Sequence, residues 1–197
     1  MVYLDQAATS FPKLDVVKQA VMDALDVAGN ANRSSNMDSS RLIFEARRNI
    51  AQFFGLSDFH RVILNGGNTE SLNTCIKGIL KEKDHVITTY AEHNSVLRPL
   101  YELEEKGIIT LTICAPYLED IKNHIQKNTR MVIMTHSSNV TGEIFDVDLI
   151  GQYCKECGVL FMVDAAQSAG HIPVSMENID VLCFSGHKGL LGIGGIG

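Results

Sequence analysis

Short apolar runs alternate with amphipathic segments along most of this 197-residue chain, and this alternation limits its possible folds more than any other feature. Residues 14–28 and 42–53 carry apolar side chains at helical spacing, with Gly29 and Gly55 placed as helix stops. The chain is predicted to be an α/β protein with a doubly wound, mostly parallel sheet, because most of the runs are apolar on both faces. The predicted strands are residues 62–64, 85–88, 108–113, 131–134, 159–163 and 181–184.

Composition and charge narrow the class of protein. Hydrophobic residues make up 45% and charged residues 20% of the chain, which is typical of a globular domain. The net charge of −6 gives no electrostatic reason to expect a nucleic-acid or anionic membrane partner. No stretch approaches the roughly 20 apolar residues that span a bilayer, and the first residues do not resemble a signal peptide. We therefore expect a cytoplasmic protein without membrane or nucleic-acid partners.

The five cysteines include one C-x-x-C pair, Cys154 and Cys157. Such a pair can bind metal or undergo redox chemistry. However, Ile150, Tyr153 and both cysteines fall at the spacing of one buried helix face, and no second pair completes a zinc site. Core packing is therefore the favoured interpretation, and no metal site is predicted.

Polar residues follow five of the six predicted strands. In open α/β sheets, ligands bind beyond the carboxyl ends of the strands, so these segments are expected to meet at one edge. Five polar segments at one edge predict a binding site. The segments are residues 65–71, 90–95, 135–139, 164–168 and 185–189.

The turn from Gly66 to Thr69 opens a predicted helix. Glycines allow a ligand close to the backbone, and the free N–H groups of a first helical turn favour an anion such as phosphate. The alternative is an ordinary helix cap formed by Asn68 or Thr69. The turn is not a P-loop, because no Gly-Lys-Ser/Thr sequence follows it.

Three ionisable residues at the same edge suggest a cofactor with an aromatic ring. Asp164 ends a very apolar strand, where a carboxylate needs a cation, such as a protonated pyridine nitrogen, or strong donors; the alternative is a helix-capping Asp. Lys188 is a candidate Schiff-base amine rather than a solvated surface charge. His93 could stack on such a ring or be an ordinary loop histidine. His136 lies at this edge without an assigned role.

The chain resembles cysteine desulfurases of the class V aminotransferase group. The resemblance lies in residues 3–12, Asn68-Thr69-Glu70-Ser71, Glu92-His93, Asp164-Ala165-Ala166-Gln167-Ser168 and Ser185-Gly186-His187-Lys188. These segments occur in the family's order and cover nearly the whole chain. The resemblance implies the large domain of fold type I pyridoxal-phosphate (PLP) enzymes, with pyridoxal 5'-phosphate as cofactor.

The resemblance also implies a role for each matched residue. Lys188 would hold PLP as a Schiff base and move protons at the substrate α-carbon, Asp164 would pair with the pyridine nitrogen, and His93 would stack on the ring. These three are the implied catalytic residues. Further cofactor contacts are implied for Asn139 and Gln167 near the ring hydroxyl, and for Asn68, Thr69, Ser185 and His187 around the phosphate.

We expect residues 1–30 to form an N-terminal arm and first helix, and residues 31–197 to form a PLP-binding large domain. The apolar, glycine-rich end from Gly192 to Gly197 is typical of a chain entering its next strand. The large domain is therefore expected to be incomplete, and the chain truncated before the small C-terminal domain. The family's Gly-Asn-Pro segment appears here as Gly29-Asn30-Ala31.

The expected function is a PLP-dependent lyase that converts cysteine to alanine and transfers the sulfur. The family's sulfur-accepting cysteine and carboxylate-binding arginine belong to its second half, so persulfide formation by this chain alone is not expected. A homodimer, a cysteine substrate and a sulfur-acceptor protein are the implied partners. The alternatives are another class V enzyme (an aminotransferase or selenocysteine lyase) and a non-catalytic PLP-binding fragment or scaffold. A nicotinamide site at Gly192-x-Gly194-x-x-Gly197 is disfavoured, because no helix follows it.

Overall fold

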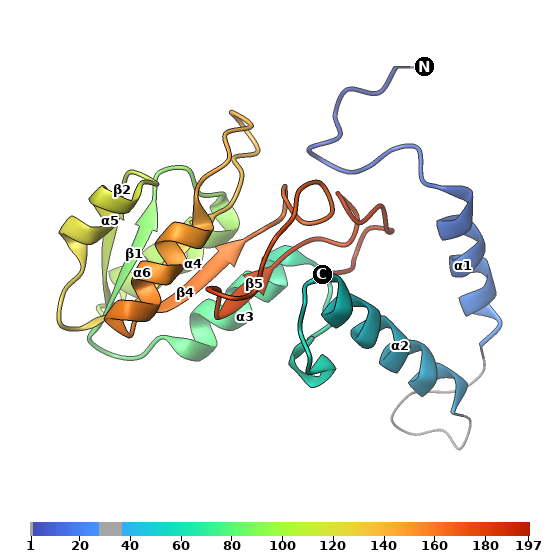
Figure 1. Cartoon of the computed structure of the whole chain (residues 1–197), viewed down its shortest axis with the longest axis horizontal. Helices are drawn as coiled ribbons and strands as arrows, with labels where there is room; N and C mark the ends of the chain where they lie inside the picture. The colour runs from blue at the N-terminus through green and yellow to red at the C-terminus, as the bar shows by residue number, and fades with distance from the viewer. Residues whose placement is uncertain (1, 28–36) are drawn as a thin grey trace.

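The computed structural model describes residues 2–27 and 37–197 and contains one five-stranded parallel sheet. All neighbouring strands pair in parallel, in the order β2-β1-β3-β4-β5 (Figure 1). The predicted α/β fold with a parallel sheet is confirmed. The strands are β1 Asp84–Thr89, β2 Ile109–Cys114, β3 Thr129–Thr135, β4 Leu160–Asp164 and β5 Val181–Cys183.

Helices cover both faces of the sheet, because its strands are apolar on both sides. On one face, α3 (Asn68–Ile79) and α4 (Asn94–Glu105) pack apolar side chains against β1, β3 and β4. On the other face, α5 (Leu118–His124) and α6 (Val147–Cys157) pack in the same way. The sheet is therefore doubly wound, as its double-sided apolar pattern predicted.

The order of the strands creates a switch point between β1 and β3. From β1 the chain crosses through α4 to β2 on one side, and from β3 it crosses through α6 to β4 on the other. The connections that leave the carboxyl ends of β1 and β3 diverge there, which opens a crevice at this edge. The polar segments after these strands border that crevice.

Two helices precede the sheet, α1 (Asp15–Leu25) and α2 (Asp38–Phe53), and a 3-10 turn η1 (Phe59–Arg61) follows them. The helical periodicity located both helices, but most of their large apolar side chains are exposed. α1 has no buried residue, and Ala51 is the one buried residue of α2. Gly29 lies outside the described residues, as does the segment Gly29-Asn30-Ala31.

Two predictions from the sequence are wrong. Residues 62–64 do not form a strand, because no strand in the described part of the chain pairs along them. Cys157 is exposed, although Ile150 and Cys154 of the same predicted stripe are buried. Cys157 is the last residue of α6, and the buried residues of this helix end at Cys154.

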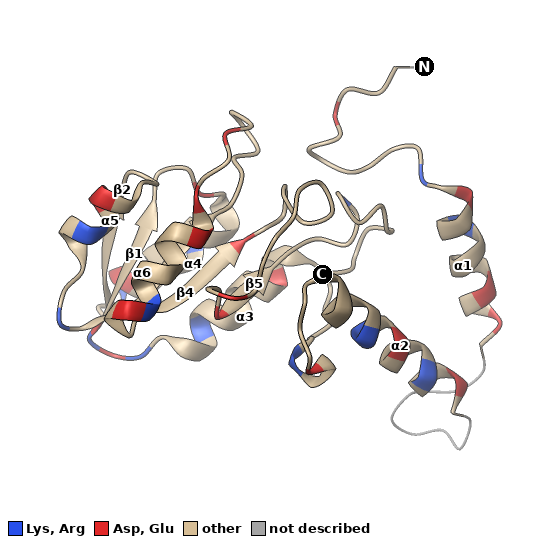
Figure 2. Cartoon of the chain, viewed as in Figure 1, with Lys and Arg blue, Asp and Glu red and all other residues tan. Residues whose placement is uncertain are grey.

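Charged residues lie on the outer helices and loops, and the middle of the sheet carries none (Figure 2). The buried strands therefore contribute apolar packing, and polar chemistry is confined to their ends. Among residues 2–27 and 37–197, no helix has the length and apolar character needed to cross a membrane.

Gly55 ends α2 through a two-bond cap. The backbone of Gly55 has φ of +72°, and the N–H of Leu56 donates to the Ala51 carbonyl at 2.8 Å. The N–H of Gly55 donates to the Gln52 carbonyl at 3.2 Å. This is a Schellman motif, which needs a left-handed residue at this position, so the predicted role of Gly55 is confirmed.

We expect Gly55→Ala to lower the free energy of unfolding by about 1 kcal/mol, because alanine is strained at a left-handed φ. The matched control is Gly78→Ala in α3, where a Cβ also meets open space. Gly78→Ala should raise the free energy of unfolding by ~0.5–1 kcal/mol, because alanine is the better helix former. Urea unfolding of both variants measures the difference. If both variants changed the free energy of unfolding equally, the assignment of Gly55 as the helix cap would be contradicted.

Candidate active site

A polar cavity of about 940 Å³ lies at the carboxyl edge of the sheet. Side chains from five separate loops and from the N-terminal arm line it. All nine residues that the sequence analysis selected are among them: Asn68, Thr69, His93, Asn139, Asp164, Gln167, Ser185, His187 and Lys188. The structure thus brings together residues up to 120 positions apart in the chain (68 to 188).

Asp164 is the one carboxylate among these nine residues, and only 3% of its surface is exposed. Its Oδ1 accepts hydrogen bonds from Asn68 Nδ2 at 2.8 Å and from the Ala166 N–H at 2.9 Å. No described residue donates to Oδ2. One oxygen therefore anchors the side chain, and the other is available to a ligand in the cavity.

The electrostatic environment connects Asp164 with Lys188. Burial raises the pKa of Asp164, and its two hydrogen bonds and the nearby His93 and Lys188 oppose that shift. Burial also lowers the pKa of the Lys188 amine, and Asp164 opposes that shift. Both groups thus carry a desolvation penalty that a polar or charged ligand between them would reduce.

The start of α3 forms a turn suited to an anion. Gly67 precedes the helix with φ of +137°, and no described group accepts a hydrogen bond from the N–H of Asn68 or Thr69. One feature opposes an anion: the Glu70 carboxylate accepts from the Gly66 N–H at 2.7 Å and also lines the cavity. An anion bound here has to share the turn with Glu70 or displace its side chain.

His93 caps α4 and lines the cavity at the same time. Its Nδ1 accepts a hydrogen bond from the Ser95 N–H at 3.1 Å and lies 2.8 Å from Ser95 Oγ. Because Nδ1 accepts from the backbone, the neutral ring carries its proton on Nε2. The cap therefore fixes both the tautomer and the position of the ring.

The N-terminal arm holds the loop that contains Lys188. The His187 carbonyl accepts from the Ser10 N–H at 3.0 Å and from Lys13 Nζ at 3.1 Å, while His187 Nδ1 lies 3.0 Å from Thr9 Oγ1. The sequence analysis missed Lys13 in this role. In the sequence, Lys13 is marked only by its position directly after the matched segment 3–12. Its contact with the His187 carbonyl, 174 positions away, could not be predicted from that position.

The remaining predicted residues differ in exposure. Ser185 is buried, Gln167 is partly buried, and Thr69 and Asn139 are exposed on the rim of the cavity. Gln167 Nε2 donates to the Ala7 carbonyl at 3.0 Å, so this amide contacts the arm as well as the cavity.

A second buried carboxyl group, Glu92, lies beside the cavity. Its Oε1 accepts from Thr89 Oγ1 at 2.6 Å and from the Thr135 N–H at 2.9 Å, which ties the ends of β1 and β3 together. Its Oε2 is buried without a partner. Burial raises the pKa of Glu92 to about 8, and the charge of Asp164 adds to that shift. Nothing in the sequence indicated a role for Glu92, because its burial depends on distant residues and is not visible from its position before His93.

Comparison with known families identifies the fold and its relatives. The sequence profile of the family "Aminotransferase class-V" matches residues 2–197. The chain belongs to the aminotransferase class-V family. Within this family, it is 36% identical over 215 residues to the cysteine desulfurase IscS of Buchnera aphidicola subsp. Acyrthosiphon pisum, a match that covers 99% of this chain and 52% of the relative.

Two solved structures have the same fold as this chain. The apo cysteine desulfurase from Thermococcus onnurineus NA1 superposes with a TM-score of 0.90 at 32% identity, covering 99% of this chain and 52% of that one. A structure described as SspA in complex with cysteine gives a TM-score of 0.91 at 27% identity, covering 100% of this chain and 60% of that one. The chain spans about half the length of the curated relatives it matches.

Glu92 makes the stability of this class-V domain depend on pH. The folded chain keeps the Glu92 proton up to about pH 8, whereas an unfolded glutamate releases it near 4.5. Stability should therefore fall as pH rises between these values, by at most about 1.4 kcal/mol per pH unit. Glu92→Gln, which imitates the protonated group, should make that fall less steep.

Urea unfolding of the native chain and of Glu92→Gln, at intervals from pH 5 to pH 8, measures how the free energy of unfolding changes with pH. The matched control is Glu105→Gln, on the exposed end of α4. Parallel pH profiles for the native chain and Glu92→Gln would contradict the buried, protonated state of Glu92.

Proposed function

We propose that this chain is the PLP-binding half of a PLP-dependent lyase of the cysteine desulfurase type, which removes sulfur from cysteine and leaves alanine. The single observation that carries the proposal is the convergence of Lys188, Asp164 and the start of α3 on one cavity. An amine, a buried acid and an anion-binding turn are the three groups that a phosphorylated pyridine aldehyde requires.

The residues around the cavity fit this cofactor. Asn68 Oδ1 is buried without a partner, and Asp164 Oδ2 has none among the described residues, so two polar atoms are free for a ligand. Asp164 would hold the pyridine nitrogen, and Asn139 and Gln167 would lie near the ring hydroxyl. The phosphate would be held by Asn68, Thr69, Ser185 and His187.

PLP, when bound, supplies an electron sink that stabilises negative charge at the substrate α-carbon. The protein residues position it and move protons. The lowered pKa of Lys188 leaves more of its amine neutral near pH 8 than in a solvated lysine, and a neutral amine is the nucleophilic form. The same amine would carry a proton to or from the substrate α-carbon. His93, with its proton on Nε2, would stack on the ring and serve as a second proton carrier.

The substrate is inferred from relatives. Those named cysteine desulfurase IscS share 33–36% identity with this chain, and one matched structure is described as SspA in complex with cysteine. Both findings favour cysteine over other amino acids. The second candidate is transamination, which the family name itself suggests.

A homodimer is proposed from the exposed apolar faces of the first two helices. Val16, Met22 and Leu25 on α1 are 60–75% exposed, and α2 exposes Phe44 and Phe53. Apolar surface of this kind is typical of a protein–protein interface. We further propose a cytoplasmic location and a sulfur-acceptor protein as partner.

We expect PLP added to the 197-residue chain to attach covalently to Lys188. After borohydride reduction, peptide mass spectrometry should find the added pyridoxyl mass on the peptide that contains Lys188. Lys188→Ala should lose this specific labelling, because Lys188 is the one lysine among the described residues that lines the cavity with Asp164.

The matched control is Lys155→Ala, on the outer surface of α6. This variant should be labelled at Lys188 as the native chain is. Equal labelling of many lysines, or unchanged total labelling in Lys188→Ala, would rule out Lys188 as the anchor.

The reaction type can be tested with cysteine, PLP and dithiothreitol, which supplies the two electrons that convert cysteine to alanine and sulfide. A desulfurase releases alanine and sulfide in equal amounts. Transamination with added pyruvate produces alanine without sulfide, so the ratio of the two products separates the candidates. The assay should be run with the native chain and with Lys188→Ala, in which any residual product measures the background of free PLP.

A further inference from the structure

Two cysteines that are far apart in the sequence meet in the core of the domain. Cys75 lies in the second half of α3, and Cys183 is the last residue of β5, 108 positions later (75 to 183). All five cysteines of the chain are free thiols. The one pair that is close in the sequence is Cys154 and Cys157, in the C-x-x-C motif of α6. The fold therefore creates a second pair that no sequence motif indicates.

Strand register and helix geometry place Cys75 and Cys183 at the same interface. Cys183 is the register partner of Asp164, so the two side chains lie on the same face of the sheet. The first residue of α3, Asn68, already reaches Asp164 with a hydrogen bond of 2.8 Å. Cys75 follows Asn68 by seven residues (68 to 75), close to two helical turns, and so lies on nearly the same side of the helix. That side of α3 packs on the face that carries Cys183.

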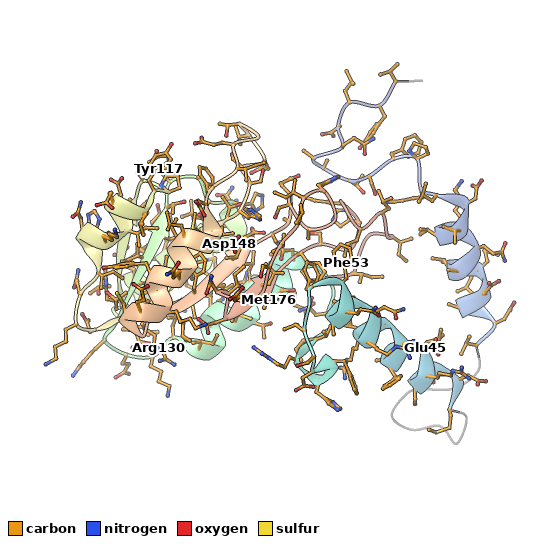
Figure 3. The ribbon with its side chains drawn as sticks, in the orientation of Figure 1. Glu45, Phe53, Tyr117, Arg130, Asp148 and Met176 are labelled. Atoms are coloured by element: carbon orange, nitrogen blue, oxygen red, sulfur yellow. The ribbon has the colours of Figure 1, made fainter. Side chains whose placement is uncertain are left out.

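The two thiols are in direct contact. Cys183 belongs to the apolar cluster between α3 and the sheet, and Cys75 packs against that cluster. Both residues line an apolar cavity of about 340 Å³ beside β5. Figure 3 shows side chains filling the space between the sheet and its helices, and here the Cys183 thiol donates a hydrogen bond to the Cys75 sulfur. A disulfide forms only where two cysteine side chains point toward each other, and this pair meets that condition.

The contact makes one thiol more reactive than the other. The hydrogen bond from Cys183 lowers the pKa of Cys75 below the usual value of a thiol, whereas the same hydrogen bond and burial raise the pKa of Cys183. The thiolate is the reactive form, so Cys75 is the nucleophile of the pair. By contrast, burial raises the pKa of Cys114 to about 11 and that of Cys154 to about 12, which keeps both as unreactive thiols near neutral pH.

We propose that Cys75 and Cys183 form an oxidation site, at which hydrogen peroxide closes an intrachain disulfide between α3 and β5. The cross-link joins the helix that begins at Asn68 to the strand that precedes Lys188, and both of these residues line the polar cavity. The oxidation is independent of PLP and does not rest on the proposed function. The alternative is that the two cysteines only pack as small apolar side chains.

The oxidation proceeds in two balanced steps. The Cys75 thiolate attacks one oxygen of hydrogen peroxide, the O–O bond breaks, and hydroxide leaves, which gives a sulfenic acid on Cys75. The Cys183 sulfur then attacks the Cys75 sulfur, the S–S bond forms, and the hydroxyl group leaves with the Cys183 proton as water. In total, two thiols lose two electrons and two protons, and one peroxide becomes two waters.

Disulfide mapping of the native 197-residue chain tests the proposal directly. After treatment with hydrogen peroxide, peptide mass spectrometry without reduction should find Cys75 linked to Cys183, with the linked pair two hydrogen masses lighter than its separate peptides. Dithiothreitol should remove the link. A link between Cys154 and Cys157 in its place, or links between chains only, would overturn the proposal. This measurement needs no variant.

A serine variant separates the attacking thiol from the resolving one. In Cys183→Ser no disulfide can close, so the sulfenic acid on Cys75 should persist and react with dimedone, while serine keeps a donor beside Cys75. In the native chain, dimedone should label Cys75 at least about tenfold less, because Cys183 consumes the intermediate. The matched control is Cys157→Ser at the exposed end of α6, which should form the disulfide at the native rate. Equal labelling of Cys75 in Cys183→Ser and the native chain, or none in either, would show that the pair only packs together.

Urea unfolding shows whether the link joins elements that are already neighbours. The disulfide closes the long loop from residue 75 to residue 183, so the oxidised chain should unfold at a higher urea concentration than the reduced chain. Dithiothreitol should abolish this shift, and Cys183→Ser should not show it after peroxide treatment. An oxidised chain that unfolds at the same or a lower urea concentration would mean that the link distorts the fold, and the proposed site would be wrong.

Discussion

The burial of Asp164 is the constraint on which the rest of this site depends. A carboxylate at the end of an apolar strand is costly unless donors reach it, and here Asn68 and the Ala166 N–H both donate to one oxygen. Asn68 is also the first residue of α3, so satisfying Asp164 fixes the start of that helix against the end of β4. The turn at the start of α3 and the acid are thus positioned by the same hydrogen bond.

Backbone contacts from distant segments hold the other side of the cavity. The His187 carbonyl accepts from Ser10 and Lys13, so the loop with Lys188 is supported by an arm from the opposite end of the chain. Glu92, the residue before His93, joins the ends of β1 and β3. The site therefore needs a correctly folded arm as well as a correctly folded sheet.

The two cavities of the domain lie on either side of the same segment. β5 borders an apolar cavity of about 340 Å³, and Ser185, His187 and Lys188, a few residues after it, line the polar cavity. Only three residues of β5 pair with β4. This short strand therefore lies between the two cavities.

The sequence by itself determined the fold class, five of six strands to within two residues at each end, and the residues that meet at the carboxyl edge. These features follow from local patterns, because the apolar run of each strand and the polar residues after it occupy consecutive positions in the sequence. Tertiary structure alone decided that residues 62–64 remain unpaired in the described part of the chain, that Glu92 is buried with a raised pKa, and that Lys13 supports His187. Each of these depends on which distant segments lie alongside, and burial, pKa and pairing are set by those neighbours rather than by the local sequence.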